Sequence, residues 1–303
     1  MALELRHLRY LLAVAEHGSF TRAAEDLRIS QPTLSQQVRQ LERTVGVPLL
    51  DRSGRSVRLT DAGETYARHA RRALRDLEAG RRAVQDVQDL TRGHLRLAAT
   101  PTFTSYLVGP LVAELHARHP GITLDVRELT QDRIESALLA DDLDLGIAFA
   151  GSHLPGILAQ TLFTETLSLV TGPPGPEAGL SRPLPVEELT DRQLGLLNGD
   201  FATRSHIDAH FAAHRVQPRV TVEANSVQAL VEIVRRTPIA TVLPDAITHD
   251  HPHLHPVPLE PALPPRTVTL LRRGSSYQSA AARAFTRLTQ DLVRARGYTD
   301  APQ

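Results

Sequence analysis

The 303-residue sequence contains neither cysteine nor lysine. Without cysteine, the chain has no disulfide framework, no thiolate nucleophile and no cysteine-based zinc site. A run of about 18 uncharged apolar residues is also missing, which excludes a transmembrane helix. The N-terminal segment carries Glu4, Arg6 and Arg9 and lacks the apolar core of a secretory signal. These absences predict a soluble cytoplasmic protein, and the length is enough for two or three domains.

The charge is distributed unevenly, although the formal net charge is zero. Residues 1–92 hold 16 arginines and 12 acidic residues, a net charge of +4, so residues 93–303 carry −4. A basic part joined to an acidic part is expected when only one of them contacts a polyanion. A chance fluctuation of four charges would produce the same split, so this signal needs support from motifs.

The first part of the chain predicts three short helices. Apolar residues recur at helical spacing over residues 5–15, and Gly18 ends that helix. Ser19 can cap a second helix, and Ser30 can cap a third, which has Pro32 in its first turn. Two helices separated by a short turn form a helix-turn-helix when the second presents polar side chains to DNA.

The third helix has one apolar face and one polar face. Leu34, Val38 and Leu41 recur at spacings of three and four, so we expect them to pack inward. Residue types that reach base edges and phosphates in a major groove lie on the other side. They are Gln31, Thr33, Ser35, Gln36, Arg39 and Gln40.

A short basic hairpin is expected after this helix. Residues 49–52 and 56–59 flank Ser53-Gly54, which is a turn signal. Arginines in or beside the hairpin, at positions 52, 55 and 58, are placed to form a wing that grips phosphates or the minor groove. A helical bundle with a solvated polar face is the alternative, and the basic wing favours DNA binding.

One long helix is predicted from Thr60 to Thr91, because this stretch lacks proline and begins with an N-cap signal. A seam of residues spaced by four and three runs along it: Tyr66, Ala70, Ala73, Leu77, Gly80, Val84 and Val87. This pattern is typical of a dimerising coiled-coil helix, here roughly 45 Å long. Because several seam residues are small, the pairing would need help from other domains. Packing within one chain is the alternative.

Strands and helices alternate in the rest of the chain. The expected strands are 95–100, 123–129, 143–149, 162–170, 194–198, 220–223, 239–243 and 267–272. The expected helices are 104–119, 131–140, 203–214, 226–236 and 277–296. This order predicts an α/β domain that begins with a βαβαβ unit and a parallel sheet. Ligands of such folds bind beyond the carboxyl ends of the strands, near helix N-termini.

Uncharged polar and aromatic residues occupy several of these strand ends. Residues 100–105 read Thr-Pro-Thr-Phe-Thr-Ser, and residues 198–203 form a similar joint with Phe201 and Thr203. Thr130, Phe149 and Asn225 end other strands. Hydroxyls beside free helix N–H groups suit a small anion, whereas an amino acid would need a carboxylate for its ammonium group. Ordinary helix capping is the alternative for these hydroxyls.

No cofactor, metal or catalytic site is expected. The histidines at 249, 251, 253 and 255 alternate with other residues in a proline-rich loop, and no carboxylate is placed to complete a metal site. A glycine-rich phosphate loop, a nucleophile elbow and a zinc-protease helix are all missing. An enzyme would need an acid–base or nucleophile constellation, and a solute-binding receptor would need a secretion signal.

Four segments resemble the LysR-type transcriptional regulators, with that family's spacing. They are residues 20–24 (FTRAA), 30–37 (SQPTLSQQ), 46–50 (GVPLL) and 59–63 (LTDAG). The resemblance extends from about residue 4 to 297. It implies a winged helix-turn-helix over residues 1–59, a linker helix over 60–92, an effector-binding domain over 93–297 and a tail over 298–303. That domain would have two α/β lobes similar to periplasmic binding proteins, lobe I over 93–163 and 267–297 and lobe II over 164–266.

The resemblance also implies partners and contact residues. The partners would be double-stranded DNA, a small-molecule effector, other copies of the chain in a dimer of dimers, and RNA polymerase. The implied DNA contacts are Ser30, Gln31, Pro32, Thr33, Ser35, Gln36, Arg39, Arg52 and Arg55. The implied effector contacts are Thr100, Thr102, Thr130, Phe201 and Thr203, to which the strand-end argument adds Phe149 and Asn225.

A narrower resemblance concerns the effector. Residues 15–24, 51–55, 90–93, 100–106 and 223–226 are similar to regulators that respond to cyanate. This similarity implies that cyanate, a small linear anion, activates genes for cyanate detoxification through this protein. Another effector, such as an aromatic acid or an amino acid, is the alternative within the family.

Overall fold

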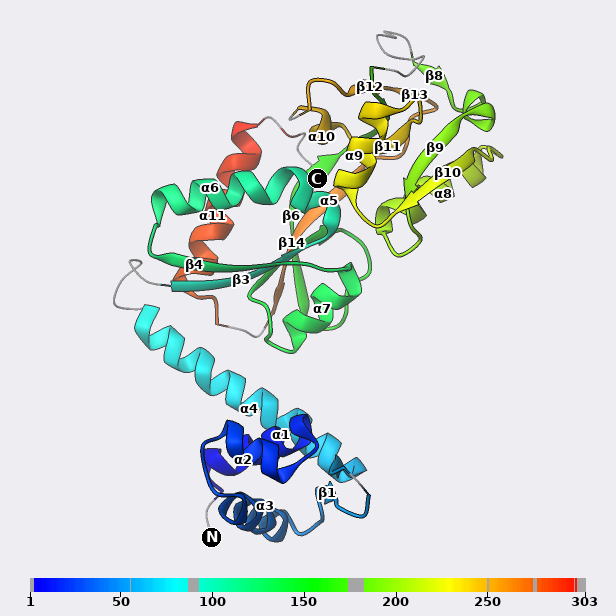
Figure 1. Ribbon diagram of the computed structural model, residues 1–303. Coiled ribbons are helices and arrows are strands. Elements are labelled where there is room, and N and C mark those ends of the chain that lie inside the picture. Colours follow the sequence, from blue (N-terminus) through cyan, green and yellow to red (C-terminus); the bar gives the residue numbers. More distant parts are fainter. Residues whose placement is uncertain are drawn as a thin grey trace. The chain divides into compact units, whose positions relative to one another are not determined.

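The computed structural model describes residues 3–54, 56–86, 93–173, 183–249, 251–274, 277–296 and Tyr298. The chain divides into two units, Met1–Gln85 and Asp86–Gln303, which we call the head and the sensor unit (Figure 1). Arg55 and residues 87–92 lie outside the described residues, so Val87 and the end of the expected linker helix are not discussed further.

The head begins with three helices, α1 (Leu5–His17), α2 (Phe20–Asp26) and α3 (Gln31–Val45). Ser19 and Ser30 cap α2 and α3, and each hydroxyl accepts a backbone N–H from three residues further on. The first and third helices end at Gly18 and Gly46, both in the left-handed conformation that glycine adopts without strain. Short-range signals therefore set the bounds of all three helices.

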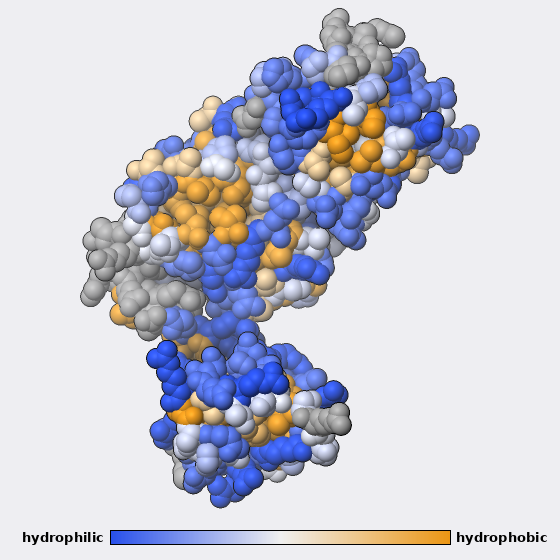
Figure 2. All heavy atoms as spheres, viewed as in Figure 1, coloured by the Kyte–Doolittle hydropathy of each residue, from blue (hydrophilic) through white to orange (hydrophobic). Residues whose placement is uncertain are grey.

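The apolar faces of these helices meet in one core. Leu11, Leu34, Val38 and Leu41 are fully buried there, and Leu49 joins them from the segment before the hairpin. The polar face of α3 remains outside this core. Hydrophilic residues cover most of the face of the head that Figure 2 shows.

The hairpin and the long helix complete the head. Strands β1 (Leu50–Asp51) and β2 (Arg58–Leu59) pair antiparallel, and α4 (Asp61–Asp86) follows directly. The hydroxyl of Thr60 accepts the backbone N–H of Gly63 and donates to the carbonyl of Pro48. This threonine thus both caps α4 and ties it to the segment that precedes β1.

The seam of α4 has two different halves. Tyr66 packs against the core of the head, and Ala70 is buried. Further along, Leu77 and Val84 are 52% and 69% exposed. Packing within the chain therefore accounts for the beginning of the seam, and the later half presents apolar side chains to solvent.

The sensor unit contains two lobes, and lobe I is built on a five-stranded sheet with the order β4-β3-β5-β14-β6. Its strands are β3 (Gly93–Ala99), β4 (Ile122–Glu128), β5 (Leu145–Phe149), β6 (Ile157–Glu165) and β14 (Arg266–Arg273). The first three are parallel, as expected, but β14 runs antiparallel to β5 and β6. The sheet is therefore mixed, because the chain leaves lobe I along β6 and returns along β14.

Helices cover both faces of this sheet (Figure 1). One face carries α6 (Gly109–Arg118) and α11 (Ala280–Ala295). A short α5 (Pro101–Phe103) and a π-helical turn η1 (Thr104–Val108) run without a break into α6. The other face carries α7 (Gln131–Leu139), which buries Ile134 and Leu138.

Lobe II consists of small sheets and their covering helices. Its strands are β7 (Leu167–Thr171), β8 (Leu184–Pro185), β9 (Gln193–Leu197), β10 (Arg219–Ala224), β11 (Thr241–Pro244), β12 (His255–Val257) and β13 (Leu259–Glu260). Its helices are η2 (Val186–Asp191), α8 (Ala202–Ala213), α9 (Val227–Arg236) and α10 (Asp245–His249). The single strand expected over 162–170 is two strands, because the chain passes from lobe I to lobe II at Thr166.

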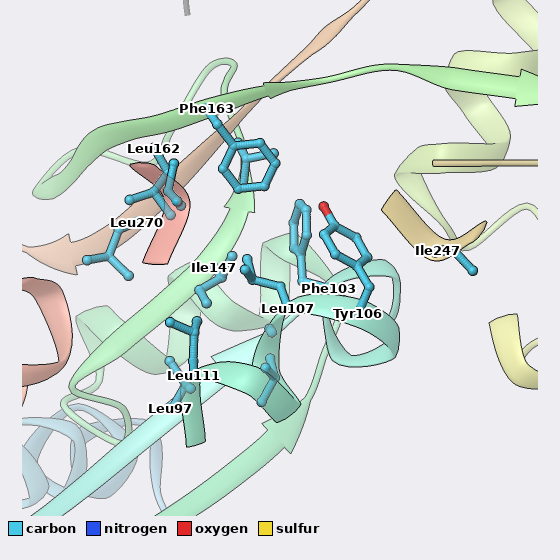
Figure 3. Packing of buried hydrophobic residues seen from close by; sticks show 14 of the residues in the cluster. Leu97, Phe103, Tyr106, Leu107, Leu111, Ile147, Leu162, Phe163, Ile247 and Leu270 are labelled. Atoms are coloured by element: carbon cyan, nitrogen blue, oxygen red, sulfur yellow. The ribbon is translucent and has the colours of Figure 1, made fainter. Parts of the chain in front are cut away.

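The lobes share part of one hydrophobic core. Tyr106 and Phe163 of lobe I belong to the same cluster as Val231 and Ile247 of lobe II. Figure 3 shows Phe103 and Tyr106 side by side in this cluster, and their ring centroids lie 6.1 Å apart.

Among the helices in the described part of the chain, none is both long and apolar enough to cross a membrane.

Candidate functional site

A pocket of about 430 Å³ lies between the two lobes of the sensor unit, at the carboxyl ends of β3, β5 and β9. Its lining is Thr100, Pro101, Thr102, Thr130, Gln131, Asp132, Phe149, Gly199, Asp200, Phe201, Ala202, Thr203 and Ser205. The fold therefore brings together every predicted effector contact except Asn225. Asn225 follows β10, one strand further out than β9, and the next residue, Ser226, caps α9.

Three helical segments begin at this pocket. Thr100, Thr130 and Phe201 occupy the N-cap positions of α5, α7 and α8, all with extended backbone conformations. None of these three residues makes a side-chain capping hydrogen bond. The N-termini of helices carry partial positive charge and unpaired N–H groups, so their convergence favours a negatively charged or acceptor-rich ligand.

The Thr100 hydroxyl is buried at the pocket without a hydrogen-bond partner among the described residues. This side chain is 5% exposed. A buried hydroxyl without a partner costs free energy, which a bound acceptor would recover. Helix capping, the alternative expected from the sequence, therefore does not explain Thr100.

Two hydroxyls join the lobes across the pocket. The Oγ1 atoms of Thr102 in lobe I and Thr203 in lobe II lie 3.1 Å apart, and both side chains are 1% exposed. Thr203 also accepts a hydrogen bond from Nη1 of Arg266 at 3.0 Å. The pocket wall is thus tied directly to the strand along which the chain returns to lobe I.

Arg266 is the main residue that the sequence did not single out. It faces Glu165 across the β6–β14 ladder, at the two points where the chain crosses between lobes, and the two side chains form a buried ion pair. Its guanidinium carbon lies 3.9 Å from the ring centroid of Phe149, which lines the pocket. The strand pattern offered no signal for it, because Arg266 lies immediately before the strand expected over residues 267–272.

Tyr106 completes this buried group. Its hydroxyl donates to Oε2 of Glu165 at 2.6 Å. Burial, reinforced by the charge of Glu165, raises the pKa of Tyr106 well above its usual value, so the phenol stays protonated and remains a donor. Burial raises the pKa of Glu165 as well, and Arg266 acts in the opposite direction.

The expectation of an uncharged pocket is wrong in one respect, because Asp132 and Asp200 line it. A hydrogen bond from the Thr130 hydroxyl, together with backbone N–H groups at the start of α7, lowers the pKa of Asp132, which is therefore ionised at neutral pH. Strand-end positions alone did not indicate these two carboxylates, since Asp132 follows the end of β4 by four residues and Asp200 follows the end of β9 by three.

The second candidate site is an open hollow of about 1000 Å³ on the head, between α3 and the hairpin. Its lining is Gln31, Pro32, Ser35, Gln36, Arg39, Glu42, Arg43, Gly46, Val47, Pro48 and Arg52. Most of the predicted DNA contacts lie here. Ser30 and Thr33 are outside the lining, and their hydroxyls bond each other at 2.7 Å at the start of α3.

Within the residues that the structure describes, no three histidine, aspartate or glutamate side chains are grouped to hold a metal ion.

Two protein-family models match the chain. The model described as bacterial regulatory helix-turn-helix protein, lysR family, matches residues 5–64, and the LysR substrate binding domain matches residues 88–294. A probable RuBisCO transcriptional regulator from Trichormus variabilis is 31% identical in an alignment 300 residues long, which covers 93% of this chain and 86% of that relative.

Solved structures agree with these matches. A variant of full-length OxyR from Pseudomonas aeruginosa has a TM-score of 0.72 and 26% identity, and the match covers 100% of both chains. Full-length CbnR, solved in complex with its target DNA, has a TM-score of 0.66 at 22% identity over 95% of this chain and 99% of that chain, which shows a shared fold. The matching family consists of transcriptional regulators and not of enzymes. The chain therefore belongs to the LysR family of DNA-binding transcriptional regulators.

Proposed function

We propose that this protein activates transcription in response to a small anion that binds between the lobes of its sensor unit. The observation that carries the proposal is the Thr100 hydroxyl, which is buried, lines the pocket and lacks a partner among the described residues. Thr102 and Thr203 add two further hydroxyls at the boundary between the lobes.

The electrostatics of the pocket support an anion of low charge. The starts of α7 and α8 provide partial positive charge at the pocket, whereas Arg266 is paired with Glu165 and adds little net charge. Asp132 and Asp200 add negative charge to the lining, which disfavours a ligand with several negative charges. A monoanion that bonds to Thr100 satisfies both conditions.

Cyanate is our first candidate for this anion. The support is the similarity of residues 100–106 and 223–226 to cyanate-responsive regulators, together with the unpaired Thr100 hydroxyl beside the helix N-termini of the pocket. The target genes would then encode cyanate detoxification. The relative described above is named for RuBisCO and not for cyanate. The choice of cyanate therefore depends on residues 100–106 and 223–226 and on the pocket.

A larger carboxylate, such as an aromatic acid, is the second candidate. A volume of about 430 Å³ exceeds what a three-atom anion fills, and pockets of 300 Å³ or more commonly hold larger ligands. The rings of Phe149 and Phe201 are present to contact an aromatic group.

On the DNA side, we propose that α3 enters the major groove. Gln31, Ser35, Gln36 and Arg39 share the hollow beside the hairpin with Pro32, and glutamine, serine and arginine are polar types that contact bases and phosphates. Ser30 and Thr33 at the start of α3 would face the DNA backbone, and Arg52 would contact it from the wing. The expected contact of Arg55 lies outside the described residues.

The assembly that we propose is a dimer, or a dimer of dimers, acting in the cytoplasm. The exposed half of the α4 seam supports pairing of linker helices. Paired heads would then contact successive turns of DNA. As an activator, the bound protein would contact RNA polymerase.

Calorimetric titration of the full-length protein tests the effector. We expect wild-type protein to bind sodium cyanate or, failing that, sodium benzoate, and we expect Thr100→Val to lose at least tenfold in affinity. Thr241→Val is the matched control, because Thr241 is also a buried threonine whose hydroxyl has no partner among the described residues, but it lies outside the pocket. Equal affinity in wild type and Thr100→Val would contradict the proposed site.

Footprinting on DNA upstream of its own gene, with and without cyanate, tests the regulatory part. We expect a protected region whose pattern changes on addition of cyanate. A pattern that responds to benzoate but not to cyanate would favour the second candidate.

A further inference from the structure

The surface of the head that we assign to DNA includes a carboxylate. Glu42 lies on α3, lines the hollow between α3 and the hairpin, and has a side chain only 10% exposed. A negative charge beside phosphates is unfavourable unless it is compensated. The contacts of Glu42 therefore need an explanation in terms of DNA binding.

The two oxygens of this carboxylate have different partners. Oε1 accepts the backbone N–H groups of Leu49 and Leu50 at 2.9 and 3.1 Å, which connects α3 to the first strand of the hairpin. Oε2 accepts from Nη2 of Arg52 at 2.7 Å. One side chain thus holds both the backbone of the hairpin and its arginine.

Arg52 is restrained from a second side. Its guanidinium carbon lies 5.5 Å from the ring centroid of Phe20, in α2, and its side chain is 36% exposed. The arginine is therefore held between Phe20 of α2 and Glu42 of α3, instead of extending into solvent as an unpaired charge. Its pairing with Glu42 leaves little net charge at the base of the wing.

We propose that Glu42 is a positioning residue for DNA recognition, which fixes Arg52 against α3 and prevents it from acting as an independent phosphate-binding charge. The proposal rests on the DNA-binding role of the head and changes the part assigned to Arg52. An arginine that is free to swing out binds any phosphate backbone, whereas a fixed one contributes only when the DNA fits the head. Glu42 thereby increases discrimination between an operator and other DNA.

The test uses Glu42→Gln in the full-length protein. Glutamine keeps a carbonyl oxygen for the two backbone N–H groups but loses the charge that holds Arg52. On a random-sequence duplex, each added phosphate contact steepens the dependence of log affinity on log salt by about 0.9. We therefore expect the affinity of Glu42→Gln to fall about threefold more per head than that of wild type between roughly 50 and 200 mM salt.

Glu16→Gln is the matched control. Glu16 is exposed on α1, outside the hollow, so this change adds the same net charge to the head without releasing an arginine. We expect it to keep the wild-type salt dependence. If Glu16→Gln steepened the salt dependence as much as Glu42→Gln, net charge would explain the effect and the proposal would fail.

A double-mutant cycle assigns the effect to Arg52. In the Glu42→Gln background, Arg52→Gln should remove the additional salt dependence, and the ratio of affinities for upstream DNA and the random duplex should be lowest in Glu42→Gln alone. An unchanged salt dependence and ratio in Glu42→Gln, with wild-type protein binding both duplexes, would overturn the role of Glu42. Failure of wild-type protein to bind either duplex would instead contradict the DNA-binding function itself.

Discussion

Two threonines illustrate how the surroundings of a side chain decide its significance. Thr100 and Thr241 are both buried, and neither hydroxyl has a partner among the described residues. Thr241 sits in β11 within the core of lobe II, whereas Thr100 lines the pocket between the lobes. Only the Thr100 hydroxyl is placed to bind a ligand, so the free-energy cost of leaving it unpaired has a functional explanation.

Replacement of Thr100 by valine should stabilise the protein without ligand and reduce the stabilisation that the ligand adds. Valine has nearly the same shape and no unsatisfied hydroxyl, so we expect the free energy of unfolding to rise by about 1 kcal/mol. Thermal unfolding of the full-length protein, with and without the effector identified by titration, measures both effects. Thr241→Val should be stabilised similarly, but its unfolding temperature should still rise as much as that of wild type when ligand is added. A destabilised Thr100→Val would indicate that the hydroxyl has an internal role.

Gln36 offers a residue-scale prediction on DNA. Its side chain is exposed on α3 in the hollow that we assign to DNA. Glutamine pairs with adenine and arginine with guanine in the major groove, at about 1–3 kcal/mol of discrimination per bidentate contact. We therefore expect Gln36→Arg to change the preferred base at one operator position from adenine to guanine. Selection of binding sites from a randomised operator measures this, and identical preferences at every position would refute it.

At the scale of elements, α4 packs closely against the segment that precedes the hairpin. A Cβ atom added at Gly63 would lie 1.9 Å from the carbonyl oxygen of Leu49. No side chain fits at that distance, so the helix can dock here only through glycine. At Gly80, further along the same helix, an added Cβ would meet nothing within 4 Å.

These two glycines should therefore respond in opposite ways to the same substitution. Gly63→Ala must push α4 away from Leu49, and we expect it to destabilise the head by about 1–3 kcal/mol. Within one chain, Gly80→Ala removes backbone freedom from a helical position, and alanine is another small seam residue, so it should stabilise α4 by about 0.5–1 kcal/mol. Denaturant unfolding of the full-length variants measures both. Similar stabilities for the two variants would show that the junction adapts without cost.

At the scale of the whole molecule, the linker helix connects DNA binding to assembly. Its early seam packs against the head through Tyr66, and its later seam exposes Leu77 and Val84. The head carries only a small excess of positive charge, so one head alone should bind DNA weakly. Two heads joined through the exposed seam would bind far more tightly, because the second contact becomes intramolecular.

Leu77→Asp should separate the chains. An aspartate at this exposed seam position places a charge in the proposed helix–helix contact, so we expect a smaller assembly by light scattering and at least a hundredfold weaker operator binding. Thr65→Asp adds the same charge to an exposed position off the seam and should keep the wild-type assembly. A Leu77→Asp protein that assembles normally would assign dimerisation to another surface.

Local signals determined the head, and they could be read from the sequence. The caps at Ser19 and Ser30, the stops at Gly18 and Gly46 and the spacing of Leu34, Val38 and Leu41 all act within a few residues of each other. Short-range hydrogen bonds and helical periodicity depend only on neighbours, so the structure reproduces these elements closely. The strand ends around the pocket were equally accessible, because parallel strands deliver their carboxyl ends to one edge.

Only the tertiary structure decided what these residues meet. Arg266 bonds Thr203, 63 residues away, and Thr102 meets Thr203 over a separation of 101 residues, because the chain crosses between the lobes twice. The same crossing splits the expected strand at Thr166 and turns β14 antiparallel. The sequence by itself determined a LysR-type head and a hydroxyl-rich strand edge. The folded chain decides that Thr100 stays unpaired, that Asp132 and Asp200 line the pocket and that Arg266 is neutralised by Glu165. These outcomes depend on contacts between distant segments, which exist only in the folded chain.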